Sequence, residues 1–301
     1  MFTALGIFPS LAFSKDNGDV LKNIKHLDWG GIEVVWLKND RLPLYNVSIY
    51  FADGALSDGA KHYGETELMF ELLSEGTKRY SSEEISESLE FFGASYGARV
   101  THEYSEFSVN GMVKDIAPTM KMICHLFSDA TFPKKEVAKS LKTKITGLKN
   151  SIREHGWLAS RVFREVSLKG TPYSYPVGGK LKDLRHIASS ELKEKLSYFR
   201  DKVKKRIYIS GPKEVLNLKK IFLGDCGWSG KGANFVRSES YENQTSGDKP
   251  QVYLATVPHS NQAQVRIGRF LNEDEINNEY AMMLAAHYLG GGFTSQLMRE
   301  V

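Results

Sequence analysis

The strongest constraint on the fold is the repeated switch between two hydrophobic periodicities along the chain. Short β-branched and aromatic runs such as Ile32–Leu37 and Val47–Phe51 are typical of strands. They alternate with segments whose apolar residues recur at helical spacing. The longest of these begins at Pro133 and keeps an i, i+4 rhythm, carried by Val137, Leu141, Ile145, Leu148 and Ile152. The alternation predicts an α+β fold, with helices covering one face of a mixed or antiparallel sheet.

Caps and spacing place the other elements. A helix is predicted over Glu65–Ser74, and the capping box Ser81–Glu84 opens another that ends near Gly93. Further helices are predicted at Ile116–Phe127, Trp157–Leu168, Glu191–Arg200, Glu214–Phe222 and Ile276–Leu289. Further strands are predicted at Ala98–Val100, Tyr104–Val113, Arg206–Ser210, Val252–Val257 and Ala263–Phe270.

Composition narrows the class of protein. The 301 residues include 40 basic and 36 acidic side chains, so the formal charge of +4 does not require a nucleic acid or an anionic membrane as partner. The charged share of 25% is ordinary for a folded protein. Cys124 and Cys226 cannot by themselves make a cysteine zinc site. A disulfide between them is possible, although their spacing alone does not show it.

The domain organisation is read from changes in composition. Residues 15–223 are predicted to form a first domain, and 224–249, rich in Gly, Ser and Asn, a linker. Residues 250–301 are then expected to be the beginning of a second domain, cut short. Residues 1–14 are apolar and too short to span a membrane, and no later run approaches a span. They resemble the apolar part of an export signal, which favours a periplasmic or exported protein; without a basic start, a packed tail in a cytoplasmic protein is the alternative.

Two runs of charge stand out. Glu67, Glu71 and Glu75 lie at i, i+4 and i+8, which predicts a carboxylate stripe on one helix face. The stripe is either a solvated surface or a cation site suited to Mg²⁺ or Ca²⁺ rather than Zn²⁺. The segment 134–153 holds seven basic residues and one acid. The segment lacks aromatic residues. A helix that packs on a sheet is therefore a simpler interpretation than a helix that binds a nucleic acid or a membrane.

A family resemblance emerges from several ordered landmarks. The segment 64–77, GETELMFELLSEGT, resembles the G-L-A-H-F-L-E-H-M-x-F-K-G-T signature of the M16 metallopeptidases, the family of insulinase, pitrilysin and the mitochondrial processing peptidase. Residues 170–179 (GTPYSYPVGG) resemble the family's GHPYGRPVLG turn. Residues 289–300 (LGGGFTSQLMRE) resemble its LGGGFSSRLxxxLRE segment. The resemblance implies an M16-like α+β domain followed by the start of a second one.

The departures from the family pattern fall on the catalytic groups. The resemblance aligns Glu67 and Glu71 with the two zinc-ligating histidines of H-x-x-E-H, and Phe70 with the glutamate that acts as general base. The position closest to the third zinc ligand is Gly147. A catalytic zinc needs three protein ligands and a base. The resemblance therefore implies a non-catalytic member, a pseudoenzyme inactive on its own that binds no cofactor.

What the resemblance implies about function is a shared active site. In the family, two similar halves close around a peptide, with zinc on one half and an Arg and a Tyr on the other. Arg299 aligns with that Arg, whereas the Tyr would come after Val301. The chain is thus expected to bind peptide and to complete the zinc site of an H-x-x-E-H partner in a heterodimer. The alternatives are a structural subunit of a larger complex and an enzyme that uses Glu67 and Glu71 with another metal.

Overall fold

The computed structural model describes residues 21–59, 61–232, 251–257 and 260–300. The proposed export segment at 1–14 and most of the predicted linker lie outside these residues. The described chain divides into two compact units, one of residues 21–150 and 175–232, the other of residues 151–174 and 251–300. The domain boundaries proposed from the sequence stay predictions.

The first unit is built on a six-stranded sheet with the order β1-β2-β6-β3-β5-β4. The strands are β1 (Ile24–Trp29), β2 (Ile32–Lys38), β3 (Leu44–Phe51), β4 (Ser95–Val100), β5 (Ser105–Met112) and β6 (Lys205–Gly211). Only β2 and β6 pair in parallel, and every other neighbouring pair is antiparallel. The predicted α+β fold with a mixed sheet is confirmed.

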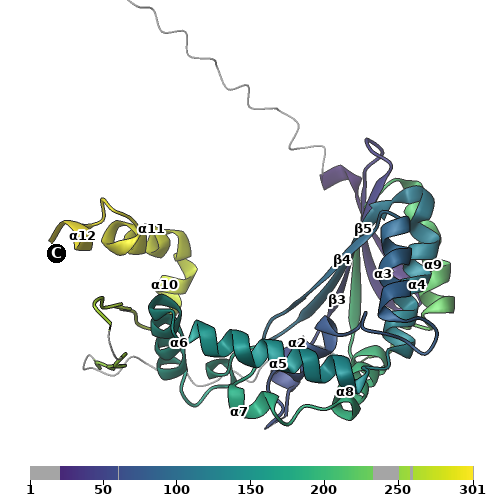
Figure 1. Ribbon diagram of the computed structural model, residues 1–301. Helices are drawn as coiled ribbons and strands as arrows, with labels where there is room; N and C mark the ends of the chain where they lie inside the picture. Colours follow the sequence, from purple (N-terminus) through teal and green to yellow (C-terminus); the bar gives the residue numbers. More distant parts are fainter. Residues whose placement is uncertain (1–20, 60, 233–250, 258–259, 301) are drawn as a thin grey trace, which may run out of the picture. The chain divides into compact units, whose positions relative to one another are not determined.

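The helices of this unit gather mainly on one face of the sheet. They are α2 (Glu65–Glu71), α3 (Ser82–Phe91), α4 (Ile116–Asp129), α5 (Lys134–Ser151), α7 (Leu181–Leu184), α8 (Ser189–Asp201) and α9 (Leu218–Lys220). Figure 1 shows α3, α4 and α9 together along one side of the strands. Burial alternates along β3, where Tyr45, Val47, Ile49 and Phe51 face the helices and the residues between them are half-exposed. The core therefore lies between one sheet face and the helical layer.

Local signals place most of these elements where the sequence predicts them. The capping box at Ser81 is present, since its hydroxyl accepts from the Glu84 amide while the Glu84 carboxylate accepts from the Ser81 amide. The long helix α5 follows Pro133 as expected. The segment predicted as one helix from Glu214 is instead a 3₁₀ turn (Lys213–Asn217), α9 and a π-helical turn (Ile221–Asp225).

A disulfide joins Cys124 on α4 to Cys226, which directly follows the π-helical turn. Their Cα atoms lie 4.6 Å apart, and 102 positions separate them in sequence. Both residues are buried in the core. The pairing left open by the sequence is therefore made, and it fastens the last segment of the unit to the helical layer.

The second unit contains α6 (His155–Ser167), α10 (Glu273–Asn277), α11 (Glu279–Gly290) and α12 (Gln296–Glu300). The strands predicted at Val252–Val257 and Ala263–Phe270 are wrong, because residues 251–257 and 260–271 have no regular secondary structure. Val252 and Leu254 are more than nine-tenths exposed. A two-stranded ribbon alone buries too little apolar surface to be stable. The helix predicted from Ile276 is interrupted at Asn278, where α10 ends and α11 begins.

Candidate functional site

The helix α2 carries the residues aligned with the catalytic motif, and its first turn is fixed by a buried aspartate. Asp58 accepts hydrogen bonds from the amides of Gly64 and Thr66, at 2.9 and 3.1 Å, and from the Thr66 hydroxyl at 2.5 Å. Gly64 has φ of +98°, a conformation that favours glycine. These contacts satisfy amides that the helix itself leaves unpaired, so the start of α2 has a defined position.

Glu67 and Glu71 are brought together by a lysine from α5. The Lys144 Nζ lies 2.5 Å from Glu67 Oε2 and 2.6 Å from Glu71 Oε1. The lysine side chain is only 17% exposed, compared with 31% and 44% for the two glutamates. Burial lowers the pKa of Lys144, but the two carboxylates outweigh it and the net shift is upward. The ammonium therefore stays charged and holds α2 against α5.

The carboxylate stripe predicted from Glu67 to Glu75 stops at Glu71. Helix α2 ends there, and Leu72 leaves the helical conformation with φ of −99° and ψ of 6°. Leu72 and Leu73 both turn into the core. Glu75 lies beyond this turn and does not share the helix face of Glu67 and Glu71. Burial of the two leucines has overridden the helical spacing.

Phe70 points into the core rather than toward the two glutamates. Its ring is 3% exposed and makes edge contacts with Phe51, Phe127 and Phe199, with centroids 5.6, 6.4 and 5.4 Å away. A side chain in such a cluster cannot exchange protons with a bound water. The position that the family resemblance aligns with the general base is thus occupied by a core aromatic residue.

Two glycines mark the borders of the site. Gly147 on α5 is exposed, and a Cβ added to it would meet nothing within 4 Å. It therefore offers no third ligand. Gly178 lies against Glu67, where an added Cβ would come 2.8 Å from Glu67 Oε2 and 3.7 Å from Lys144 Cε. The loop that carries Gly178 closes over the pair because this position has no side chain.

A second group of charges lies buried beside the start of α2. Lys195 of α8 donates to the Ser57 carbonyl at 3.0 Å and lies 3.3 Å from Asp58 Oδ1 and 3.7 Å from Glu65 Oε2. Burial raises the pKa of Asp58, although Lys195 opposes the shift. Burial also raises the pKa of Glu65 to about 7 against the pull of Lys195, and Asp58 adds to the rise. Lys195 is thus the shared cationic partner of two buried carboxylates.

Sequence reasoning missed Lys144 and Lys195 as members of these clusters. It counted Lys144 only within the basic run of 134–153. A signal was present, because Lys144 lies one turn before Gly147 on the helix expected to pack beside Glu67 and Glu71. Two carboxylates at i, i+4 repel each other, so a basic residue on the neighbouring helix is expected to pair with them.

Arg299 lies on α12 in the second unit. Its guanidinium donates to the side-chain oxygen of Gln296 one turn earlier at 2.5 Å. The side chain is exposed. Its predicted role in holding a peptide stays a prediction.

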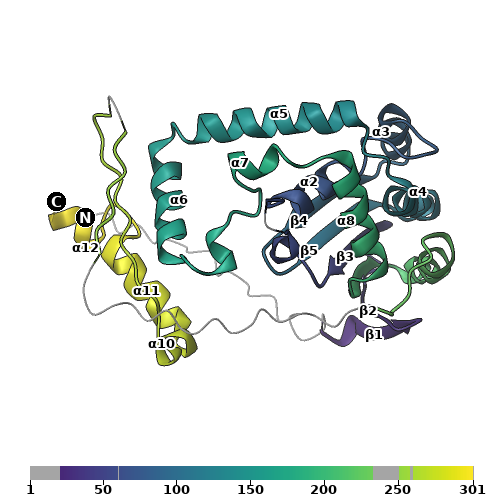
Figure 2. The same ribbon diagram turned by 90° about the horizontal axis from the view of Figure 1, so that it is seen from below.

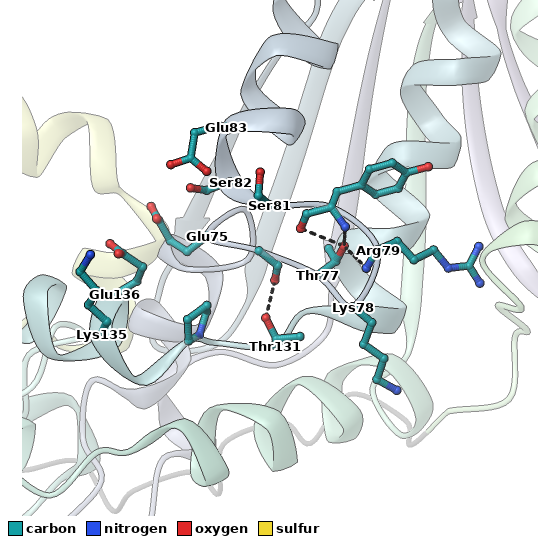
Figure 3. Close-up of a pocket in the computed structure, with 13 residues that line it drawn as sticks. Glu75, Thr77, Lys78, Arg79, Ser81, Ser82, Glu83, Thr131, Lys135 and Glu136 are labelled. Carbon is teal, nitrogen blue, oxygen red and sulfur yellow. Dashed lines mark hydrogen bonds between the residues drawn. The ribbon is translucent and has the colours of Figure 1, made fainter.

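A hollow of about 420 Å³ opens at the turn that follows α2 (Figure 3). Its lining combines Glu75, Glu83 and Glu136 with Lys78, Arg79 and Lys135. The N-terminus of α3 at its wall is already capped by Ser81 and Glu84. Charges of both signs and a filled cap give this hollow no preference for one class of ligand.

Beside α2 lies an outer strand of the sheet. Within the described residues β4 pairs only with β5, and α2 contacts β4 directly. Residues 95–99 of β4 are exposed. The outer edge of β4 thus carries unpaired main-chain groups close to the helix of Glu67 and Glu71 (Figure 2).

Known proteins match this arrangement of a mixed sheet and a motif helix. Residues 34–170 match the family model described as Insulinase (Peptidase family M16). The sequence has no match among curated proteins. This match supports an M16-like family member, and the α+β fold is of the M16 type.

Solved structures share the fold at low sequence identity. A peptidase M16 inactive domain from Pseudomonas fluorescens is 20% identical with a TM-score of 0.69, over 93% of this chain and 67% of that chain. The periplasmic protease PqqL from Escherichia coli is 15% identical with a TM-score of 0.59, over 71% and 25%. A protease from Helicobacter pylori is 12% identical with a TM-score of 0.59, over 70% and 51%. This chain thus spans between a quarter and two thirds of their lengths.

The residues present do not fit the zinc ion that the family implies. An ammonium lies between Glu67 and Glu71, Phe70 is packed in the core, and Gly147 brings no ligand. Among the described residues, no group of three or more His, Cys, Asp or Glu side chains is placed to hold a metal. Nor is any described helix long and apolar enough to cross a membrane.

Proposed function

We propose that this chain is a non-catalytic, peptide-binding M16 subunit that completes the zinc site of an H-x-x-E-H partner chain. The observation that carries the proposal is the arrangement of the side chains on α2, the helix aligned with the H-x-x-E-H motif. Phe70 packs in the core, while Glu67 and Glu71 share the Lys144 ammonium. The fold is kept without the groups that activate water. The similar fold of the inactive peptidase M16 domain from Pseudomonas fluorescens supports the same conclusion.

Peptide binding is supported by the outer edge of β4. An extended peptide can add a strand to an open sheet edge through main-chain hydrogen bonds, with little demand on its sequence. Residues 95–99 are exposed and adjoin α2. The test is amide exchange with and without an extended peptide. Protection should rise in β4 and stay unchanged in α3. Equal protection of β4 in both samples would argue against this binding mode.

The role of the chain in a heterodimer is tested by reconstitution. Peptide hydrolysis should require both this chain and an H-x-x-E-H chain from the same host, with zinc carried by the partner. Arg299→Ala should lower kcat/KM by about 10²-fold, the scale for loss of one positioned donor, with the zinc content unchanged. Arg269→Ala, which removes an arginine paired with Glu275 in the same unit, is the matched control. Zinc-dependent hydrolysis by this chain alone would refute the proposal.

A structural subunit without a peptidase role is the second candidate. The described part of the second unit exposes apolar side chains, including Val252 at 92%, Leu254 at 91% and Phe293 at 94%. Exposed apolar surface of this kind is usual where another polypeptide packs. A reconstituted complex whose activity is indifferent to Arg299→Ala would favour this candidate over the peptide-binding one.

Export to the periplasm is part of the proposal. The buried Cys124–Cys226 disulfide supports it, because structural disulfides persist mainly in oxidising compartments. The Escherichia coli neighbour is described as periplasmic, which agrees. Fractionation of the native host, followed by thiol labelling and mass spectrometry, is the test. A reduced Cys124 in the cytoplasmic fraction would favour the cytoplasmic alternative.

A further inference from the structure

We infer that Lys144 supplies, from within the chain, the positive charge that a metal ion supplies to the motif helix of an M16 peptidase. The inference goes beyond the loss of catalysis, because it says what replaces the metal and what that replacement does. Lys144 joins α2 to α5 without a bound ion. It also closes the Glu67–Glu71 pair to divalent cations.

The geometry matches the donor set of an ammonium. Lysine carries three N–H donors on a compact charge. The Glu67 and Glu71 oxygens lie 2.5 and 2.6 Å from Nζ, a short distance for charge-assisted hydrogen bonds. Both glutamates come from one helix face at i, i+4, where two carboxylates repel each other without a cation. Lys144 removes that repulsion.

The position of Lys144 is constrained on more than one side. Its side chain is 17% exposed, and the loop at Gly178 passes over the pair with room for no additional side-chain atom at that position. The other lysines of the same helix lie differently. All of them are exposed, and Lys139 contacts Glu136 on its own helix at 3.2 Å. Lys144 is therefore the lysine of α5 that turns toward α2.

Charge also explains why a divalent ion is excluded. Two carboxylates without an ammonium offer oxygen ligands of the kind that Mn²⁺ and Ca²⁺ accept. With the ammonium between them, an incoming ion meets a like charge at hydrogen-bond distance from both oxygens. The wild-type chain should therefore be indifferent to these ions, whereas a chain that lacks the ammonium should respond to them.

The test is thermal unfolding of the full chain at low ionic strength, with and without millimolar MnCl₂, CaCl₂ or ZnCl₂. Wild-type Tm should not respond to any of these salts. Lys144→Met keeps the length of the side chain and removes its charge, so Tm should fall by about 3 °C and rise again with MnCl₂ or CaCl₂. Lys142→Met on the exposed face of α5 is the control, and it should behave as the wild type does.

A second variant separates charge from packing. Adding Glu67→Gln and Glu71→Gln to Lys144→Met removes the repulsion, so Tm should recover without metal. A loss in Lys144→Met that neither metal nor this neutral triple variant relieves would assign Lys144 a packing role and overturn the inference. So would stoichiometric zinc in the wild-type chain after dialysis. These readouts involve no peptide and no partner, so they are independent of whether the proposed heterodimer exists.

Discussion

The ring of Phe70 stands edge-on to the ring of Phe199, with centroids 5.4 Å apart and planes at 89°. The family resemblance aligns Phe70 with the general base, and Phe199 belongs to α8. Because of this contact, the side chain at position 70 is part of the core between α2, α8 and the sheet. A carboxylate here would lose its hydration without gaining a partner, at a cost of several kcal/mol. Loss of the base and stability of the core are thus linked in one residue.

The first prediction concerns that link. Phe70→Ala should destabilise the chain by about 3–5 kcal/mol, because it removes a fully packed ring. Phe70→Glu, which restores the family's residue, should destabilise it further. The control is Phe91→Ala, since Phe91 is 84% exposed and its change should stay within about 0.5 kcal/mol. Urea unfolding measures all three. A Phe70→Glu chain as stable as Phe70→Ala would contradict the prediction.

The second prediction compares two glycines at the borders of the site. Gly178→Ala places a Cβ 2.8 Å from Glu67 Oε2, so the side chain or the loop must move. We expect a loss of about 1–2 kcal/mol. The Cβ that Gly147→Ala adds to α5 meets no atom within 4 Å. This variant should raise the free energy of unfolding by about 0.5–1 kcal/mol, because alanine has the higher helix propensity. Denaturant midpoints that move the same way in both variants would show that Gly178 does not close over the pair.

Much of the first unit was predictable because local and tertiary preferences agree there. The capping box at Ser81 and the helix after Pro133 depend on neighbours in sequence, and both lie where the sequence predicts them. The strands β2 and β3 follow from β-branched and aromatic runs that also face the core. Each of these signals is contained within one segment of the chain.

The site was less predictable because it depends on long-range partners. Lys144 lies 73 positions from Glu71 in the sequence. Their ion pair can be predicted only once α5 is known to lie beside α2. The end of α2 at Glu71 is set by burial of Leu72 and Leu73 rather than by helical spacing. The apparent strands from Val252 onward show the converse, since β propensity without a covering layer forms no sheet.

The third prediction concerns the disulfide. Cys124 and Cys226 close a loop of 102 positions, for which restriction of the unfolded chain contributes about 5 kcal/mol. The Cys124→Ala, Cys226→Ala double variant should lose that amount, and a reductant should lower the urea midpoint of the wild type alone. A wild-type midpoint that is unchanged by a reductant under denaturing conditions would show that the bond is not formed in the protein.

The fourth prediction concerns pH and Glu65. Burial raises its pKa from 4.5 to about 7, so the folded chain keeps a proton that the unfolded chain releases. Between about pH 4.5 and pH 7 the folded state therefore binds more protons, and stability falls as the pH rises through that window. The full cost, on the order of 3 kcal/mol, is present above pH 7 and absent below the unfolded value. The groups that face Glu65 are Lys195, Asp58, Glu191 and Glu194.

Glu65→Gln keeps the shape of the side chain and removes its ionisable carboxyl group. Its free energy of unfolding should match that of the wild type near pH 4 and exceed it at pH 8, so the two curves diverge through the window. Glu87→Gln on the exposed face of α3 is the control and should run parallel to the wild type. Urea unfolding at each pH supplies the curves. If Glu65→Gln also runs parallel, then Lys195 holds Glu65 ionised throughout, and its contact at 3.7 Å outweighs the cost of burial.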